Sequence, residues 1–200
     1  MNAMNTIKLG LSGLAIAGLL ACGGGGGGGG TNNNPPPKTA ADRLDYTNPT
    51  GAFTLVKDTN LSTSSHLVLN LMGPAGTSAT GVGFILTADT TKVSWSKPGS
   101  SDTVLARSGL FDLGTASPQL VVGKATGDQL QVAFYQKGTT KPAVTFTSSS
   151  ILASVALDLK GNIAVGSTVT LSAVAGKSLL TQGSGAPAAI SIATGTITAN

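Results

Sequence analysis

Apolar and polar residues alternate in short runs over most of the chain after residue 50, and clusters of Gly, Pro, Asn, Asp and Ser separate the runs. The clearest run is 129–136. There, Leu130, Val132 and Phe134 occupy one phase, and mostly polar residues occupy the other. A period of two is typical of a β-strand, and one polar phase indicates a sheet that is packed on one side only. The pattern therefore predicts a domain built of strands.

Comparable runs predict the remaining strands, about nine in all, and this number fits a jelly-roll β-sandwich. Seven residues on the apolar phases are predicted to form its core. The predicted strands are 52–56, 66–71, 82–86, 93–95, 119–124, 129–136, 144–146, 151–159, 169–173 and a closing stretch over 190–197. The predicted core residues are Phe84, Leu86, Leu130, Val132, Phe134, Val155 and Leu157.

Two stretches lack a clear period. Residues 40–48 fit either one helical turn or an extended segment, and both readings remain open. Residues 97–118 are predicted as a loop that holds one helical turn, which begins at Ser101 or Asp102.

The last part of the chain changes phase. Residues 169–173 are predicted as one strand. Further on, Ile192 falls in one phase and Ile197 in the other, with Gly195 between them. A β-bulge adds one residue to a strand and often contains glycine, so a bulge is predicted at Gly195.

Composition agrees with an all-β fold. Only 10% of the residues are charged, and all eight acidic residues are aspartate. Thr, Val and Ile favour strands, whereas Glu and Lys favour helices. The formal net charge is +4, but the basic residues are scattered along the chain. A nucleic-acid-binding surface needs a clustered basic patch, so nucleic acid is not expected as a partner.

The first residues have the order of a secretory signal. Lys8 is the only charged residue before an apolar run over 9–21, and the run ends in Leu-Leu-Ala-Cys at Cys22. Thirteen residues are too few to cross a bilayer, which takes about 20 apolar residues. The order of charge, apolar run and small residue is that of a signal peptide. The final four residues resemble a bacterial lipobox, which implies cleavage before Cys22 and attachment of lipid to it.

Cys22 is the only cysteine, so lipidation explains a thiol that cannot form an intramolecular disulfide. Residues 23–38 are low in complexity, with eight Gly, Thr, three Asn, three Pro and a final Lys. They are predicted to form a disordered tether that the prolines stiffen at its end, and a tether of about 20 residues has a typical span of about 25 Å. The predicted organisation is a signal peptide over 1–21, the lipidated cysteine and linker over 22–43, and a β-sandwich over 44–200.

The predicted location is the cell envelope, with the membrane contacted through the lipid. Gly23 follows the cysteine where an inner-membrane retention signal usually has Asp. By resemblance to Gram-negative lipoproteins, this favours the outer membrane.

Three stretches resemble strands of the cohesin-like sandwiches, which are related to some carbohydrate-binding modules. Residues 81–89, GVGFILTAD, look like the strand that ends in the aspartate of the F-x-L-x-Y-D segment. Residues 153–161, ASVALDLKG, look like the A-x-L-x-F-x-V-K strand, and residues 195–199, GTITA, look like the closing strand. The resemblance implies a nine-stranded jelly roll that binds a protein module, the dockerin, through one sheet face.

The chain also departs from the family pattern. Ala88 stands where the family has tyrosine, Thr90 follows the aspartate where a proline is usual, and Leu157 replaces an aromatic residue. These differences bear on partner recognition more than on the fold.

Residues for catalysis are scarce. His66 is the only histidine, and it falls on the polar phase of its strand, where a solvated position is expected. The chain has no G-x-S-x-G elbow, and a zinc site usually needs several His or Cys ligands. The aspartates at 42 and 45, or at 89, are candidate calcium ligands, but no D-x-D-x-D-G loop accompanies them. The prediction is therefore a non-catalytic protein without a metal or a cofactor, apart from the covalent lipid.

Aromatic residues suggest where a ligand binds. Stacking on a sugar needs exposed Trp or Tyr, for which Trp95, Tyr46 and Tyr135 are the candidates. Trp95 shares the phase of Val93, so a core or rim position is predicted for it. Tyr135 shares the polar phase of its strand with Gln129 and Gln131, and these three form the candidate binding face. The predicted function is recognition of a protein partner, and the alternative is a carbohydrate-binding lipoprotein that assists an envelope enzyme.

Overall fold

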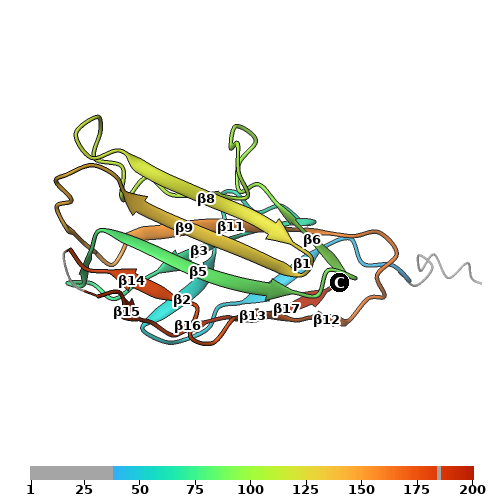
Figure 1. Cartoon of the computed structure of the whole chain (residues 1–200). Coiled ribbons are helices and arrows are strands. Elements are labelled where there is room, and N and C mark those ends of the chain that lie inside the picture. Colours follow the sequence, from blue (N-terminus) through green and yellow to red (C-terminus); the bar gives the residue numbers. More distant parts are fainter. Residues whose placement is uncertain (1–37, 184–185) are drawn as a thin grey trace, which may run out of the picture. The chain divides into compact units, whose positions relative to one another are not determined.

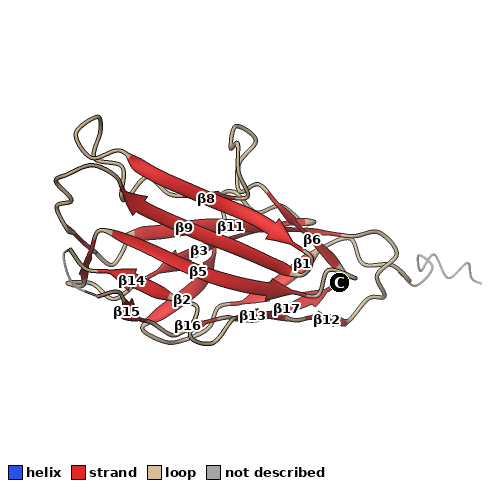
Figure 2. Cartoon of the chain, viewed as in Figure 1, coloured by secondary structure: helices blue, strands red, loops and turns tan. Residues whose placement is uncertain are grey.

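Strands supply all of the regular secondary structure in residues 38–183 and 186–200, which are the residues that the computed structural model describes (Figure 2). The predictions for the signal peptide, Cys22 and most of the tether lie outside these residues. The strands are β1 (Leu44–Thr47), β2 (Phe53–Lys57), β3 (His66–Met72), β4 (Ser78–Ala79), β5 (Gly81–Ala88), β6 (Val93–Ser96), β7 (Ala106–Arg107), β8 (Gln119–Thr126), β9 (Gln129–Gln136), β10 (Val144–Thr145), β11 (Ile151–Leu159), β12 (Ser167–Val169), β13 (Leu171–Ala173), β14 (Leu179–Thr181), β15 (Ala188–Ala189), β16 (Ile192–Ala193) and β17 (Thr196–Ala199).

Two six-stranded sheets form the body of the domain (Figure 1). The first, called the β3 sheet, has the order β16-β2-β3-β11-β6, with β7 also paired to β11. The second, called the β9 sheet, has the order β15-β14-β5-β9-β8, with β13 also paired to β5. Two small sheets, β1-β17-β12 and β10-β4, complete the described part of the chain. Nine strands have four or more residues: β1, β2, β3, β5, β6, β8, β9, β11 and β17.

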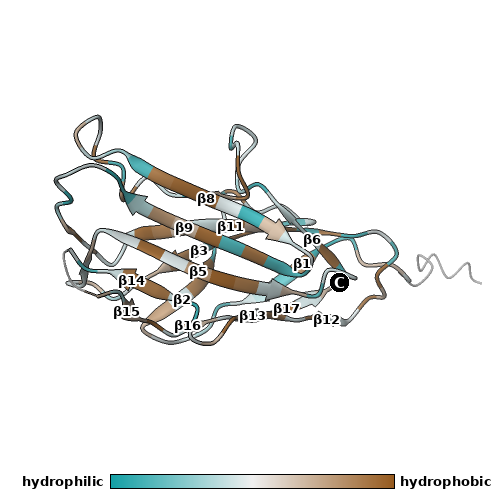
Figure 3. Cartoon of the chain, in the orientation of Figure 1, coloured by the Kyte–Doolittle hydropathy of each residue, from teal (hydrophilic) through white to brown (hydrophobic). Residues whose placement is uncertain are grey.

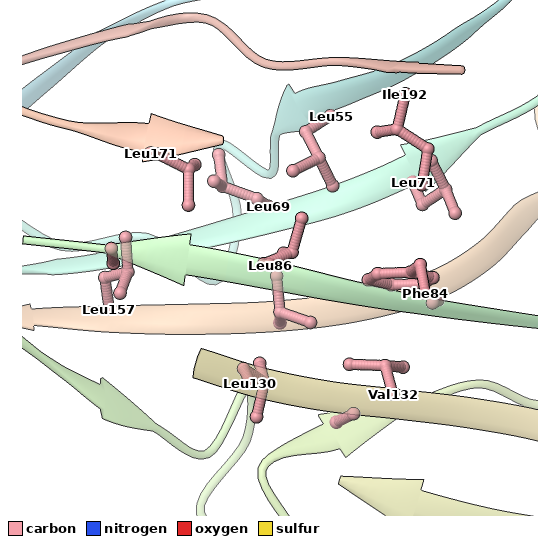
Figure 4. Close-up of a cluster of buried hydrophobic side chains, with 14 of the residues drawn as sticks. Leu55, Leu69, Leu71, Phe84, Leu86, Leu130, Val132, Leu157, Leu171 and Ile192 are labelled. Carbon is pink, nitrogen blue, oxygen red and sulfur yellow. The ribbon is translucent and has the colours of Figure 1, made fainter. Parts of the chain in front are cut away.

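Apolar side chains from both large sheets share one core (Figure 4). Alternate residues of each strand point inward, as the period of two requires. The prediction of an all-β sandwich is confirmed. All seven predicted core residues are buried, and Phe134 is completely inaccessible. Side chains that meet in this core include Leu55, Leu69, Leu71, Phe84, Leu86, Leu130, Val132, Leu157, Leu171 and Ile192.

The β3 sheet is covered on its outer face as well. Val68, Asn70 and Ser154 point away from the core, yet each is at least 90% buried. Segment 58–65, which joins β2 to β3, supplies part of the cover. Its Asp58 accepts a hydrogen bond from Asn70 Nδ2 at 2.9 Å, and Asn70 Oδ1 accepts one from Ser154 Oγ at 2.7 Å. The chain thus uses its own loop to close this face.

Two stretches that were predicted as single strands, 169–173 and 190–197, are each divided between two sheets. Residues 169–173 do not form one strand, because β12 pairs with β17 whereas β13 pairs with β5. The bulge predicted at Gly195 is also wrong, because this residue lies between β16 and β17, which belong to different sheets. The change of phase between Ile192 and Ile197 therefore reflects a crossing from one sheet to another.

Tyr46 fixes this crossing. Its hydroxyl donates to Leu55 O and accepts from Gly195 N–H, each at 2.8 Å. A Cβ atom at residue 195 would overlap the carbonyl of Thr47 and the ring of Tyr46, so glycine is required there. Burial raises the pKa of the Tyr46 hydroxyl, and the hydrogen bond from Gly195 opposes that effect.

The remaining irregular stretches are extended or looped. Ala40 forms a β-bridge with Ala164, and β1 pairs with β17, so the extended reading of 40–48 is the one observed. The predicted helical turn at Ser101 or Asp102 is wrong. Asp102 N–H instead donates to Gly99 O at 3.1 Å and closes a simple turn, before the short strand β7.

Truncation of Phe134 tests the core. Phe134→Ala should lower the free energy of unfolding by about 3–5 kcal/mol, because a buried ring is lost and a cavity remains. Denaturant unfolding followed by circular dichroism measures the change. Val165→Ala is the control, since Val165 is 43% exposed and should change stability by less than about 0.5 kcal/mol. A loss below about 1 kcal/mol at residue 134 would contradict the assignment.

The carboxylate of Asp58 should make the free energy of unfolding depend on pH in the acidic range. Burial alone would raise the pKa of Asp58, but hydrogen bonds from Asn70, Leu61 and Asn60 hold the pKa below its ordinary value. A lowered folded-state pKa contributes stability above the unfolded-state value near 3.9, and this contribution is lost as pH falls through the folded-state pKa. Asp58→Asn should therefore be less stable at pH 7 and should lose less stability between about pH 5 and pH 2. Parallel pH dependence in the two proteins would refute this role.

Candidate binding site

The outer face of the β9 sheet is built by residues that alternate with the core phase. Because Leu130, Val132 and Phe134 of β9 point inward, the register with β5 and β8 decides which side chains point outward. The outward positions are Leu120, Val122, Lys124 and Thr126 on β8, Gln129, Gln131, Ala133 and Tyr135 on β9, Gly81, Gly83, Ile85 and Thr87 on β5, and Leu179 and Thr181 on β14.

The three residues chosen from the sequence share this face. Gln129 and Gln131 are exposed, as their polar phase predicts. Tyr135 departs from the expectation of a side chain directed into solvent, because it is only partly exposed. On this face, the apolar row of Val122, Ala133 and Leu179 separates Tyr135 from Gln131.

Two glycines explain the position of Tyr135. Gly81 lies directly opposite Tyr135 in the register, and Gly83 follows on the same outward phase. A Cβ atom on either glycine would overlap the tyrosine, at the ring for Gly81 and at the hydroxyl for Gly83. The ring therefore lies over the backbone of Gly81 and Gly83, where β5 has no outward side chains. The pattern Gly-x-Gly on the outward phase of β5 is the sequence signal that could have indicated this arrangement.

The hydroxyl of Tyr135 lies on the side of the two glycines that faces β14. The side chain of Thr181, on β14, lies close to it. Burial raises the pKa of the hydroxyl, and the interaction with Thr181 acts in the opposite direction. Tyr135 is therefore a neutral, preorganised side chain at neutral pH, with part of its ring open to a ligand.

A shallow hollow adjoins the tyrosine. Its volume is about 300 Å³, near the lower limit for small-molecule sites. Its wall combines apolar side chains with one amide and one ammonium group. The outward residues that line it are Gly83, Ile85, Val122, Gln131, Ala133, Tyr135, Lys177 and Leu179. Figure 3 shows the same mixture of apolar and polar residues along β5, β8 and β9.

His66 lies elsewhere, on the outer face of the β3 sheet, and the expectation of a solvated histidine is wrong. Its side chain is 25% exposed, and Nδ1 lies 2.5 Å from Asp158 Oδ1 on β11. Ser96 Oγ lies 3.4 Å from the same Nδ1. A Ser–His–Asp triad needs the serine and the aspartate on opposite ring nitrogens. The arrangement around His66 is therefore not that of a triad.

The other aromatic candidates have structural partners. Trp95 is partly buried against the core, and its Nε1–H donates to Asp128 O at 3.1 Å, which confirms the rim position. Tyr46 is used at the crossing before β17. Of the three aromatics singled out from the sequence, Tyr135 is thus the one on an open sheet face.

The aspartates considered as calcium ligands are engaged in ion pairs. Asp42 pairs with Lys38, Asp45 with Arg43, and Asp89 with Lys92, at 2.5, 3.1 and 2.9 Å. Within the described ranges, no group of three or more His, Cys, Asp or Glu side chains is placed to hold a metal ion. In the same ranges, no helix is long and apolar enough to span a membrane.

Comparisons with known proteins find similarity among solved structures. Neither the protein-family models nor the curated proteins include a match to this chain. A similar solved structure is the sixth cohesin of scaffoldin B from Acetivibrio cellulolyticus, crystallised with a mutant Cel5 dockerin. The two chains are 19% identical, the alignment covers 73% of this chain and 97% of that chain, and the TM-score is 0.43. A similarity at this level establishes neither a family nor a function.

Proposed function

We propose that the domain is a non-catalytic module that binds a protein partner through the outer face of the β9 sheet. The observation that carries the proposal is Tyr135, which lies across Gly81 and Gly83 beside an apolar hollow. Tyrosine is enriched at protein interfaces because it buries apolar area while its hydroxyl stays hydrogen-bonded. A ring that is already held in place loses little conformational entropy when a partner covers it.

The shape of the face favours a macromolecule over a small ligand. The hollow is shallow and lies on a broad sheet surface, and Leu120, which is 38% exposed, extends the apolar area along β8. Gln129 and Gln131 add hydrogen-bonding groups next to this area. An apolar centre bordered by neutral polar groups is the usual anatomy of a protein interface.

The absence of catalysis is part of the proposal. His66 is the only histidine of the chain, and Nδ1 of its ring is the atom that lies close to both Asp158 and Ser96. Nucleophilic catalysis by a serine needs a base that reaches the hydroxyl through its other nitrogen. The arrangement around His66 therefore supplies no Ser–His–Asp triad.

We also propose that Cys22 carries a lipid that holds the domain at the outer membrane. The support is the sequence alone: one positive residue, a short apolar run and Leu-Leu-Ala-Cys. Within the described domain, the first and last residues adjoin, because Asp42 N–H and Arg43 N–H each donate to Asn200 O at 2.9 Å. Figure 1 shows β9 running away from that end, so Tyr135 lies toward the opposite end of the sheet.

Substitutions on the face test the binding role. A partner isolated from envelope extract with the wild-type chain should bind the Tyr135→Ala, Gln131→Ala double variant at least tenfold more weakly, because aromatic residues at the centre of an interface often contribute 2 kcal/mol or more. Titration calorimetry measures the affinity, and thermal unfolding shows whether the variant remains folded. Val165→Ala serves as the control for an exposed residue outside this face.

Two results would reject the proposed role. If the double variant binds the partner with unchanged affinity, the face is wrong. If a glycan array shows that the chain binds a polysaccharide through Tyr135 while no protein partner depends on this residue, the carbohydrate-binding alternative replaces the protein-binding one.

The lipid anchor has a separate test. Cys22→Ser removes the thiol that receives the lipid, so the chain should lose palmitate labelling and should no longer partition into the detergent phase. The wild-type chain expressed in the same cells is the comparison. Equal partitioning of the two chains would mean that Cys22 is not the anchor.

A further inference from the structure

The outer face of the β9 sheet has an uneven charge. Lys124 is exposed on β8, beside Gln131, and Lys177 lines the hollow from the turn between β13 and β14. The outward positions of β5, β8, β9 and β14 include no aspartate, and the chain has no glutamate. The face therefore carries positive charge around an apolar centre.

Ion pairs engage some of the charged residues of the described domain and not others. Five aspartates, at positions 42, 45, 89, 102 and 158, pair with basic side chains. Lys124 and Lys177 take part in none of the ion pairs found among the described residues. Their charges remain available to a partner.

The strand order places the two lysines on opposite sides of the hollow. Lys124 belongs to β8, at one edge, and Lys177 precedes β14 on the other side, with β9 and β5 between them. Three inter-strand spacings correspond to about 14 Å. This backbone spacing suits two carboxylates carried by a chain that crosses the sheet.

We propose that the partner presents an acidic segment, with an apolar side chain that enters the hollow beside Tyr135 and carboxylates that pair with Lys124 and Lys177. This inference rests on the proposed protein-binding role of the same face. An extended segment rises about 3.3 Å per residue, so roughly four residues separate the two acidic positions. The apolar side chain lies between them and contacts Tyr135 and Leu179.

Charge reversal separates this inference from binding in general. A library of random 12-residue peptides is displayed and selected on the detergent-solubilised full chain. The selected peptides should be enriched in Asp and Glu around an aromatic or aliphatic residue. They should bind the Lys124→Glu, Lys177→Glu double variant at least about tenfold more weakly, because like charges repel across an interface. Raising the salt concentration should weaken binding to the wild-type chain, since exposed charges are screened.

The matched control is the Lys57→Glu, Lys97→Glu double variant, which changes the net charge by the same amount. Lys57 is the last residue of β2 and Lys97 follows β6, and both strands belong to the β3 sheet. This control should bind the peptides with wild-type affinity. Selected peptides that need Tyr135 but carry no excess of acidic residues, or that bind the two charge-reversed variants alike, would overturn the acidic partner and leave the proposed function standing. Failure to select any peptide that is sensitive to Tyr135→Ala would count against both.

Discussion

Burial of one apolar phase between two sheets is the constraint on which the rest of this structure depends. Phe134 and its inward neighbours on β9 meet inward residues of β3 and β5, and all of them are inaccessible or nearly so. A shift of one residue in the register would turn the whole apolar phase to solvent. Because that shift is so unfavourable, the register of β9 is fixed, and the outward residues, including Tyr135, are fixed with it.

The outward phase of β5 then acquires a meaning that its composition alone does not give. Glycine inside a strand lowers stability, since it adds backbone entropy to the unfolded chain and packs no side chain. Gly81 and Gly83 nevertheless occupy consecutive outward positions, and Tyr135 fills the space above both. Contact between a neighbouring strand's ring and an otherwise bare backbone offsets part of that cost. The same contact leaves a flat aromatic surface at the edge of the hollow.

Local pattern was sufficient for the strands and the core, because a period of two depends only on neighbouring residues. It was insufficient wherever the chain changes sheets. Nothing near Gly195 distinguishes a bulge from a crossing, since the deciding contact comes from Tyr46, 149 residues away. The same reason explains the error at His66, whose partner Asp158 is 92 residues distant. The alternation along β9 correctly predicted that Tyr135 points outward. That its ring lies flat against the sheet depends on Gly81 and Gly83 in β5.

The two outer faces of the sandwich differ in what covers them, and this difference favours the β9 sheet as the binding surface. On the β3 sheet, Asn70 of β3 donates a hydrogen bond to Asp58 of segment 58–65, so this loop shields the outward side chains of the sheet. On the β9 sheet, Leu120 and Gln131 remain exposed in the described structure, and the outward positions offer Lys124 no carboxylate. Apolar area beside unpaired positive charge gains most from a cover that supplies both apolar contact and carboxylates. A partner segment with those two properties would complete on this face what the 58–65 loop completes on the other.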